Sequence, residues 1–133
     1  MLNRKTIAEL RSNCGIDSLI KTMMTTADKV AALHRDLAEL KRRVYDREAE
    51  LAEVELPFQE EVSQNGRNEA ERKAKFARLC MNSETWQRVR QETDDVVHHR
   101  DMMQAELDGL YARLSTQRIA ANLITATLNA SVE

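Results

Sequence analysis

The sequence predicts an all-α protein, built as a long antiparallel helical hairpin of the coiled-coil type with short accessory helices. Apolar residues recur alternately three and four positions apart over two long stretches. Such a heptad repeat keeps one seam of each helix facing a partner helix along its whole length. Pro57 and Gly66 mark the segment between the two stretches. We therefore expect the chain to fold back there, with residues 1–133 forming a single helical domain.

The two seams consist mainly of Leu, Val, Ile and Met. The first comprises Ile16, Leu19, Met23, Thr26, Val30, Leu33, Leu37, Leu40, Val44, Arg47, Leu51, Val54 and Phe58. The second comprises Trp86, Val89, Thr93, Val96, Arg100, Met103, Leu107, Leu110, Leu114, Gln117, Ala121, Ile124 and Leu128. Three polar members, Arg47, Arg100 and Gln117, interrupt the pattern. Each either extends its polar head toward a carboxylate, such as Asp94 or Glu39, or fixes the register of the helix pair.

Before the central break, the sequence predicts two helices and a turn. A short helix is expected at about 4–13, because Thr6-Ile7-Ala8-Glu9 has the pattern of a capping box. Asp17 or Ser18 caps a long helix at about 17–56. This helix is expected to end before Pro57, which disfavours helical geometry at the preceding residue and has no backbone N–H to donate. A turn at 57–66 follows and includes Ser63-Gln64-Asn65-Gly66.

After the break, a helix is predicted at about 67–81 and a second long helix at about 84–130, because Asn82-Ser83-Glu84 has the character of a new N-cap. Two registers of the long helices are open. The first, favoured by their equal lengths, pairs Leu56 with Glu84, Val44 with Val96, Leu37 with Met103, Leu33 with Leu107 and Ile16 with Ile124. In the second, one helix continues from residue 67 through 82–84, which shifts the register by about two heptads.

The composition indicates no partner by charge alone. Lys and Arg number 20 and Asp and Glu 22, so the formal net charge is −2, and no overall field favours nucleic acid or an anionic membrane. No apolar run has the ~18 residues that a membrane span needs, and the N-terminus lacks the apolar core of a secretory signal. We expect a cytoplasmic protein without a membrane partner. Cys14 and Cys80 have no paired or metal-binding spacing and are interpreted as inert thiols.

No residue pattern predicts catalysis, a cofactor or a metal site. Asp94, Asp95, His98 and His99 cluster on one helix, but they flank the seam, and carboxylate-bridged metal sites in bundles need ligands from several helices. His34 is alone on its helix and is interpreted as a flank residue rather than a base. The chain has three glycines in all, too few for a glycine-rich phosphate-binding loop. We therefore expect a protein that is not an enzyme.

One end of the predicted hairpin is uncharged. Residues 119–132 contain no charged side chain, and neither do residues 22–27. A helix with small and apolar residues on most of its circumference is normally buried all round. We therefore expect the chain to self-associate there, as a dimer or a larger helical bundle. The predicted interface comprises Ile16, Leu19, Ile20, Met23, Leu123, Ile124 and Leu128.

A basic cluster gives an alternative function. Arg67, Arg72, Lys73, Lys75 and Arg78 lie within twelve residues, and phosphate contacts need only such charges on one face of a helix. Glutamates are interleaved among them, as on ordinary solvated helices, and no free aromatic platform accompanies them. Nucleic-acid binding is therefore the second interpretation.

The stretch from Asn68 to Leu128 resembles small helical proteins encoded in bacteriophage and prophage genomes. The likeness lies in the helix Asn-Glu-Ala-Glu-Arg-Lys-Ala-Lys, the break Met-Asn-Ser-Glu-Thr-Trp, the long acidic heptad helix, and Leu-Ser-Thr-Gln-Arg before an apolar end. Those proteins have no assigned function, so the resemblance carries over no site residues. It implies a phage or prophage context, in which small helical proteins act as scaffolds, adaptors or accessories of DNA recombination and packaging.

These patterns favour a non-enzymatic interaction or assembly module of phage or prophage type that self-associates. Its expected partners are a second copy of the chain and, as a further option, another phage or host protein. The alternative is an accessory DNA-binding protein of phage recombination or packaging that uses the basic helix at 67–78.

Overall fold

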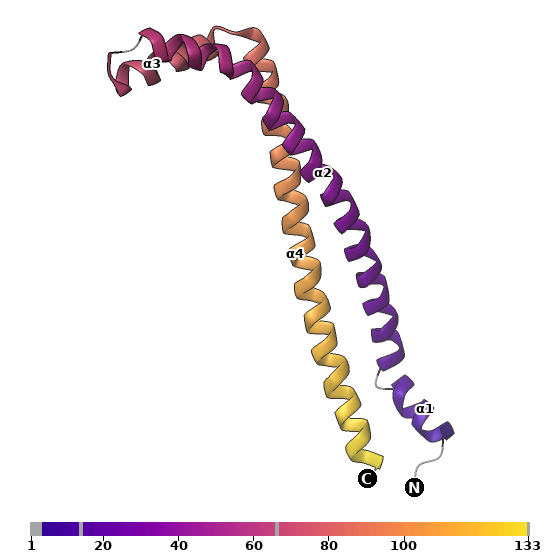
Figure 1. Cartoon of the computed structure of the whole chain (residues 1–133). Coiled ribbons are helices and arrows are strands. Elements are labelled where there is room, and N and C mark those ends of the chain that lie inside the picture. Colours follow the sequence, from indigo (N-terminus) through magenta and orange to yellow (C-terminus); the bar gives the residue numbers. More distant parts are fainter. Residues whose placement is uncertain (1–3, 14, 66, 133) are drawn as a thin grey trace. The chain divides into compact units, whose positions relative to one another are not determined.

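The computed structural model describes residues 4–13, 15–65 and 67–132, and 96% of it is helical. The described residues form four helices: α1 (Arg4–Asn13), α2 (Ile16–Asn65), α3 (Glu69–Met81) and α4 (Glu84–Val132). They contain no strand (Figure 1). The predicted all-α class is confirmed. Cys14, one of the two predicted inert thiols, lies outside the described residues.

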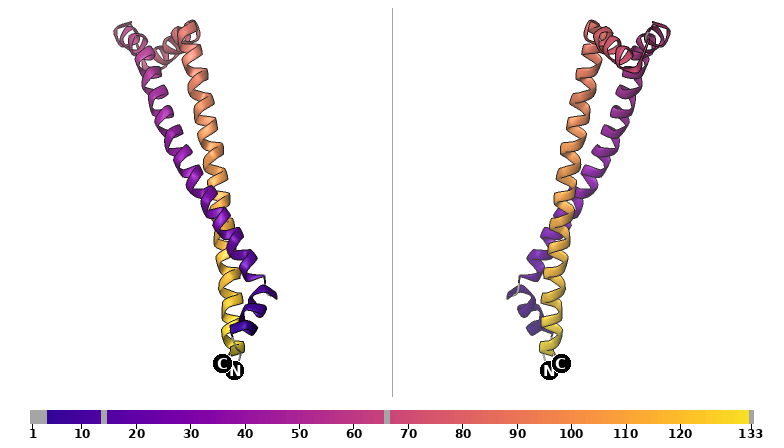
Figure 2. Two further views of the ribbon diagram at one scale, coloured as in Figure 1. Left: turned by 90° about the vertical axis from the view of Figure 1, so that its right-hand side faces the viewer. Right: turned by 90° about the vertical axis from the view of Figure 1, so that its left-hand side faces the viewer.

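The chain divides into two compact units. Unit 1 holds residues 1–36 and 104–133, and unit 2 holds residues 37–103. Both α2 and α4 contribute a segment to each unit. Within each unit the two segments run in opposite directions (Figures 1 and 2), and side chains of one contact the other. This pairing confirms the predicted antiparallel helical hairpin.

The packing of α2 against α4 follows the two predicted seams. Every seam position is buried or half-buried. In unit 1 the buried apolar side chains are Ile16, Val30, Leu107, Leu110 and Leu114. In unit 2 they are Leu37, Leu40, Val44, Leu51, Val62, Cys80 and Val89. The heptad pattern therefore identifies the core of each unit, apart from Val62 and Cys80, which lie outside the seams.

Contacts within unit 2 show how its two long segments are aligned. The Thr93 hydroxyl donates to the Arg47 carbonyl oxygen over 3.4 Å. The indole Nε1 of Trp86 donates to Glu55 Oε1 over 3.0 Å. These contacts fit the first predicted register and not the register shifted by two heptads.

Arg47 occupies its seam position by extending toward carboxylates. Its Nη1 lies 2.9 Å from Glu50 Oε2 on the same helix and 3.1 Å from Glu92 Oε2 on α4. The aliphatic part of such a side chain can cover the seam while the guanidinium reaches water. Because all three side chains are partly exposed, each pair contributes at most about 1 kcal/mol.

The other two polar seam residues behave differently from each other. Arg100 pairs with the adjacent Asp101, with 3.0 Å between Nη2 and Oδ1. The Oε1 of Gln117 is buried in unit 1 and has no hydrogen-bond partner among the described residues. Asp94 and Glu39, the carboxylates suggested from the sequence, pair with other arginines of their own helices.

The first long helix does not end before Pro57, which corrects the predicted turn at 57–66. α2 continues through Pro57 to Asn65. A proline inside a helix removes one hydrogen bond and kinks the helix without necessarily ending it, and the last part of α2 turns aside from its earlier direction (Figure 1). Beyond the proline, Val62 is buried and lines a groove together with Phe76 of α3. Packing against α3 therefore offsets the local cost of the proline.

Backbone and side-chain caps define three of the helix ends. Gly15, with a φ of +73°, joins α1 to α2 in a conformation that glycine adopts without strain. Asn68 Oδ1 accepts a hydrogen bond from the Glu71 N–H over 2.8 Å at the start of α3. Ser83 Oγ accepts one from the Trp86 N–H over 3.2 Å, in the N-cap position predicted for α4. The break at 82–83 thus separates α3 from α4.

Candidate functional site

The predicted self-association residues all lie in unit 1, and two of them are exposed. Ile16 is buried in the seam. The half-buried members are Leu19, Met23, Ile124 and Leu128. Ile20 is 37% exposed and Leu123 is 65% exposed. Of the predicted interface residues, Leu123 therefore presents most of its apolar side chain to a partner, and Ile20 presents about a third of its own.

Two further large apolar residues that the sequence did not single out are exposed on the same two helices. Met24 is 63% exposed and lies four residues after Ile20 on α2, and Ile119 is 59% exposed and lies four residues before Leu123 on α4. Residues four apart share one face of a helix. Each long helix of unit 1 thus carries a pair of large exposed apolar side chains. The four-residue spacing was the signal that could have found them.

The uncharged surface around these residues is less polar than its composition suggests. The hydroxyls of Thr22, Thr25, Thr116 and Thr127 each donate to the backbone carbonyl oxygen four residues earlier, over 2.9–3.1 Å. Such internal bonds satisfy the hydroxyl donors within their own helix. A partner can therefore cover these threonines without stranding an unpaired donor.

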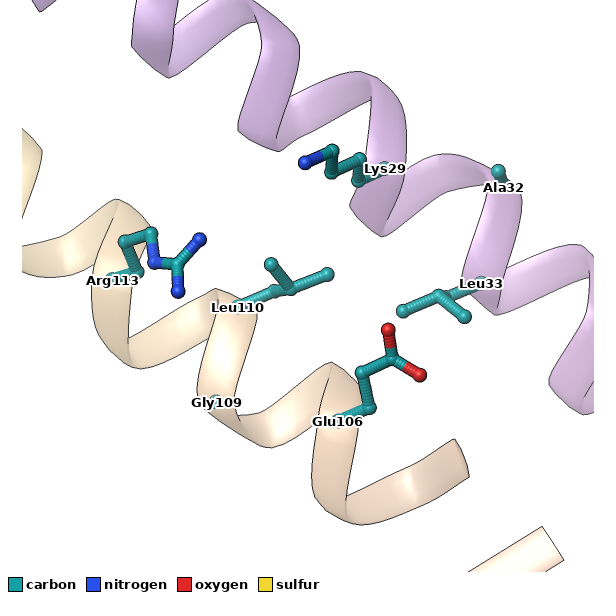
Figure 3. A pocket seen from close by; sticks show the side chains of 7 residues that line it. All are labelled: Lys29, Ala32, Leu33, Glu106, Gly109, Leu110 and Arg113. Atoms are coloured by element: carbon teal, nitrogen blue, oxygen red, sulfur yellow. The ribbon is translucent and has the colours of Figure 1, made fainter. Parts of the chain in front are cut away.

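A groove of about 540 Å³ lies between α2 and α4 in unit 1. Its lining residues are Lys29, Ala32, Leu33, Glu106, Gly109, Leu110 and Arg113. Leu33 and Leu110 point toward each other from opposite helices, and the charged side chains stand around them (Figure 3). This lining offers apolar and ionic contacts rather than a nucleophile held beside a base.

His34 is engaged by the opposite helix of unit 1. Its Nε2 is hydrogen-bonded to the Tyr111 hydroxyl, and the ring centroids are 5.6 Å apart at an interplanar angle of 67°. Edge-to-face pairs of this kind contribute about 0.5–1.5 kcal/mol beyond the area that they bury. The residue considered as a candidate base from the sequence thus makes a contact that joins α2 to α4.

The residues of the predicted nucleic-acid site are divided between two surfaces of unit 2. Arg72 and Lys73 line a groove of about 270 Å³ against the end of α2. Lys75 and Arg78 line a different hollow, of about 370 Å³. Arg67 precedes α3, where its backbone N–H donates to Glu71 Oε2 over 3.3 Å. The helix therefore does not gather its basic side chains on one face.

Both lysines of this cluster are also paired with glutamates. Lys73 Nζ lies 3.2 Å from Glu69 Oε1, and Lys75 Nζ lies 3.9 Å from Glu61 Oε1. A phosphate group would have to compete with these carboxylates for the ammonium groups. These ion pairs reduce the positive electrostatic potential around α3, and with it the attraction for a nucleic acid.

The carboxylate and histidine cluster on α4 is exposed, and both of its carboxylates have partners on the same helix. Asp94, Asp95, His98 and His99 are all exposed. Asp94 pairs with an arginine four residues earlier, and Asp95 accepts a hydrogen bond from a glutamine four residues earlier. Across residues 4–13, 15–65 and 67–132, no three His, Cys, Asp or Glu side chains are placed to hold a metal ion together.

Comparison with known proteins identified no similar protein. No protein-family model matches the chain, and neither a curated protein nor a solved structure was found to match it. Among the described helices, none carries a stretch that is long and apolar enough to span a lipid bilayer.

Proposed function

We propose that this protein is a non-enzymatic interaction or assembly module that self-associates through the exposed apolar side chains of unit 1. The observation that carries the proposal is the exposure of Ile119 and Leu123 on an α4 segment that has no charged residue from position 119 to 132. Isolated apolar residues on a surface are ordinary, but large side chains grouped within an uncharged surface are typical of interaction sites.

Covering this surface supplies a favourable free energy for association. Fully burying a Leu, Ile or Met side chain is worth about 1.5–3 kcal/mol. Ile119 and Leu123 on α4 supply two such side chains, and a symmetric dimer uses each residue twice. Only the part of this gain that exceeds the entropy lost on association remains as affinity.

The phage or prophage context belongs to the same proposal. It is supported by the resemblance of residues 68–128 to small helical phage proteins, among which scaffolds and adaptors act through protein contacts. A second copy of the chain is the first partner that the proposal requires. A further phage or host protein is a second.

The alternative of a DNA-binding accessory has weaker support. Its basic residues are divided between two hollows, and Lys73 and Lys75 are paired with glutamates. Retention of the protein on single- or double-stranded DNA that decreases steeply with salt would favour this alternative.

Sedimentation equilibrium at concentrations on the order of 10–100 μM tests the proposal. We expect the unmodified protein to form dimers or larger species. The double variant Ile119→Glu with Leu123→Glu should be monomeric at the same concentrations, because charges would be buried without partners. The matched control is Leu56→Glu with Met81→Glu, which places the same charges on exposed apolar positions of unit 2 and should leave association unchanged.

Two outcomes contradict the proposal. If the unmodified protein is monomeric throughout this range, unit 1 does not mediate self-association. If the control variant dissociates as readily as the unit 1 variant, the contact lies elsewhere. Circular dichroism of each variant shows whether its helices are intact.

A further inference from the structure

The groove between α2 and α4 in unit 1 differs in charge between its two ends (Figure 3). At one end, Lys29 of α2 and Arg113 of α4 extend their basic groups toward each other from opposite helices. Glu106 lines the other end, seven residues before Arg113 on α4. Leu110 lies between Arg113 and Glu106. The groove thus has a basic end, an apolar middle and an acidic end.

Asp36 adds a second carboxylate to the acidic end. It follows Lys29 by seven residues on α2, and residues seven apart lie on the same face of a helix. Because α2 and α4 run antiparallel and Lys29 lies near Arg113, seven residues forward on α2 reach the same level as seven residues back on α4. Asp36 is therefore level with Glu106. Each helix presents one base and one acid, about 10 Å apart along its axis.

These charged side chains are exposed, and none of them forms an ion pair with another residue that the structure describes. The other positions that share this face of unit 1 by their spacing are uncharged. They are Ser18, Thr22, Thr25 and Ala32 on α2, and Gly109, Thr116, Ala120, Leu123 and Thr127 on α4. The face therefore carries two bases and two acids that are free to pair with charges from outside the unit.

Small residues keep the groove open between its two ends. Gly109 of α4 and Ala32 of α2 line it together with the leucines. An added Cβ at Gly109 would meet no atom within 4 Å, so the space beside it is free. No bulky side chain of α2 or α4 at these two positions keeps another helix from approaching the groove.

We propose that a second copy of this chain docks on this groove, face to face, about a two-fold axis that crosses α2 and α4 between their basic and acidic ends. The rotation places the basic end of each copy on the acidic end of the other. Lys29 then meets Asp36, and Arg113 meets Glu106, of the second copy, and each pair occurs twice because the contact is isologous. This contact is separate from the apolar contact of the proposed function and does not depend on it.

Charge complementarity selects both the partner and its orientation. The groove needs an occupant with an acid and a base about 10 Å apart on one face, and this chain presents that pattern on both long helices. A two-fold axis parallel to the helices would instead place Lys29 against Arg113 of the second copy. Like charges in contact oppose association. The groove charges therefore favour a second copy in the antiparallel orientation.

The nature of the contact determines the concentration at which it can be tested. Its charged side chains are exposed in the single chain, and ion pairs near a surface contribute little each. We therefore expect a weak dimer, with a dissociation constant on the order of 1 mM. In an assembly that is already held by a stronger contact, such a weak contact acts at a high effective concentration.

The test uses a chain that carries Ile119→Glu and Leu123→Glu, which remove the apolar contact. This background chain is studied by sedimentation equilibrium at protein concentrations up to about 1 mM. The ionic strength is about 0.1 M, at which charges more than ~10 Å apart are screened. We expect the background chain to dimerise in this range.

Two charge-reversed variants are made in the same background. Lys29→Glu with Arg113→Glu makes both ends of the groove acidic, and Asp36→Lys with Glu106→Lys makes both ends basic. The dissociation constant of each variant alone should rise at least about tenfold, because like charges would meet. An equimolar mixture should dimerise again, since every acidic end then faces a basic end.

The matched control is Arg35→Glu with Arg118→Glu, which reverses two exposed charges of unit 1 outside this face. It changes the net charge as much as Lys29→Glu with Arg113→Glu does, and it should leave the dissociation constant within about twofold. Circular dichroism of every variant shows whether its helices are intact.

Three outcomes would overturn the proposal. The first is a background chain that stays monomeric at about 1 mM. The second is a mixture of the two folded, charge-reversed variants that fails to dimerise. The third is a control that dissociates as readily as the acidic variant, because net charge rather than pairing would then govern association.

These outcomes are independent of the proposed function. The unmodified chain can be monomeric at 10–100 μM, which contradicts the apolar contact, while the background chain still dimerises at about 1 mM through the groove. Conversely, Ile119 and Leu123 can mediate association while the charge-reversed mixture stays monomeric. Each contact therefore succeeds or fails by its own measurement.

Discussion

The indole Nε1 of Trp86 donates a hydrogen bond to Glu55 Oε1 over 3.0 Å, and so joins the first turn of α4 to α2 two residues before Pro57. Both side chains are partly buried. The bond reaches a charged acceptor at the place where α2 loses a backbone donor to the proline ring. It therefore holds α2 and α4 together where α2 itself is weakened.

Replacing Trp86 with Phe should lower the free energy of unfolding by about 1–2 kcal/mol, because a hydrogen bond to a partly buried charged group is lost together with apolar area. Urea titration followed by circular dichroism measures the change. Glu55→Gln, which keeps an acceptor oxygen, should lower it by less. A Trp86→Phe variant as stable as the parent would show that the hydrogen bond contributes nothing.

Substitutions at seam positions should lower the free energy of unfolding far more than substitutions at exposed positions. Leu37 of unit 2 and Leu107 of unit 1 are 3% and 2% exposed, so replacing either with Ala should lower the free energy of unfolding by about 2–5 kcal/mol. Glu48 is exposed on α2, and Glu48→Ala should change it by less than ~0.5 kcal/mol. Similar values for all three variants in a denaturant titration would contradict the heptad assignment.

Gln117 should be a site where an apolar substitution stabilises the protein. Its Oε1 is buried without a hydrogen-bond partner among the described residues, and a buried unsatisfied group costs about 1–3 kcal/mol. Gln117→Leu, with similar helix propensity, should therefore raise the free energy of unfolding by about 1 kcal/mol. Gln91→Leu, at an exposed position whose amide donates to Asp95, should not raise it. A loss of stability in Gln117→Leu would indicate that the amide has a role in the seam.

The helices and their seams could be predicted because the information is local. A heptad pattern repeats every two helical turns. It requires only that one stripe of each long helix is buried against the other long helix, whatever else surrounds them. The end of α2 could not be predicted in the same way. Pro57 is a strong local signal for a helix end, whereas the residues that keep α2 helical to Asn65 pack against α3. That contact depends on how α3 folds back, which no local window contains.

The candidate interface was predicted only in part, for a related reason. Leu19 and Leu123 have the same apolar character in the sequence, yet Leu19 is half-buried in the seam and Leu123 is largely exposed. Composition cannot tell whether an apolar residue is covered by its own chain or by another. The direction of each side chain around its helix decides it. The heptad pattern contains this direction, because Leu19 is a seam position whereas Leu123, Ile119 and Met24 lie off the seam.

Cys80 is a buried thiol in unit 2 whose reactivity can report on the packing around it. It is 2% exposed. Burial raises the pKa of the Cys80 thiol, and the nearby negative charge of Glu55 raises this pKa further. Both effects disfavour the thiolate, which is the form that reacts with alkylating reagents.

In a Cys14→Ala variant, alkylation of Cys80 by iodoacetamide at pH 8 should therefore be at least about tenfold slower than in the same protein unfolded in urea. Because the pKa is raised, the rate should still increase with pH above ~9.5, where an ordinary cysteine with a pKa of about 8.5 is almost fully ionised and its rate levels off. Glu55→Gln removes the negative charge and lowers the pKa, so it should increase the rate at pH 8 and have little effect at high pH. An equal increase at every pH would mean that the substitution opens the unit instead, through loss of the contact with Trp86. A native rate equal to the unfolded rate would contradict the burial of this thiol.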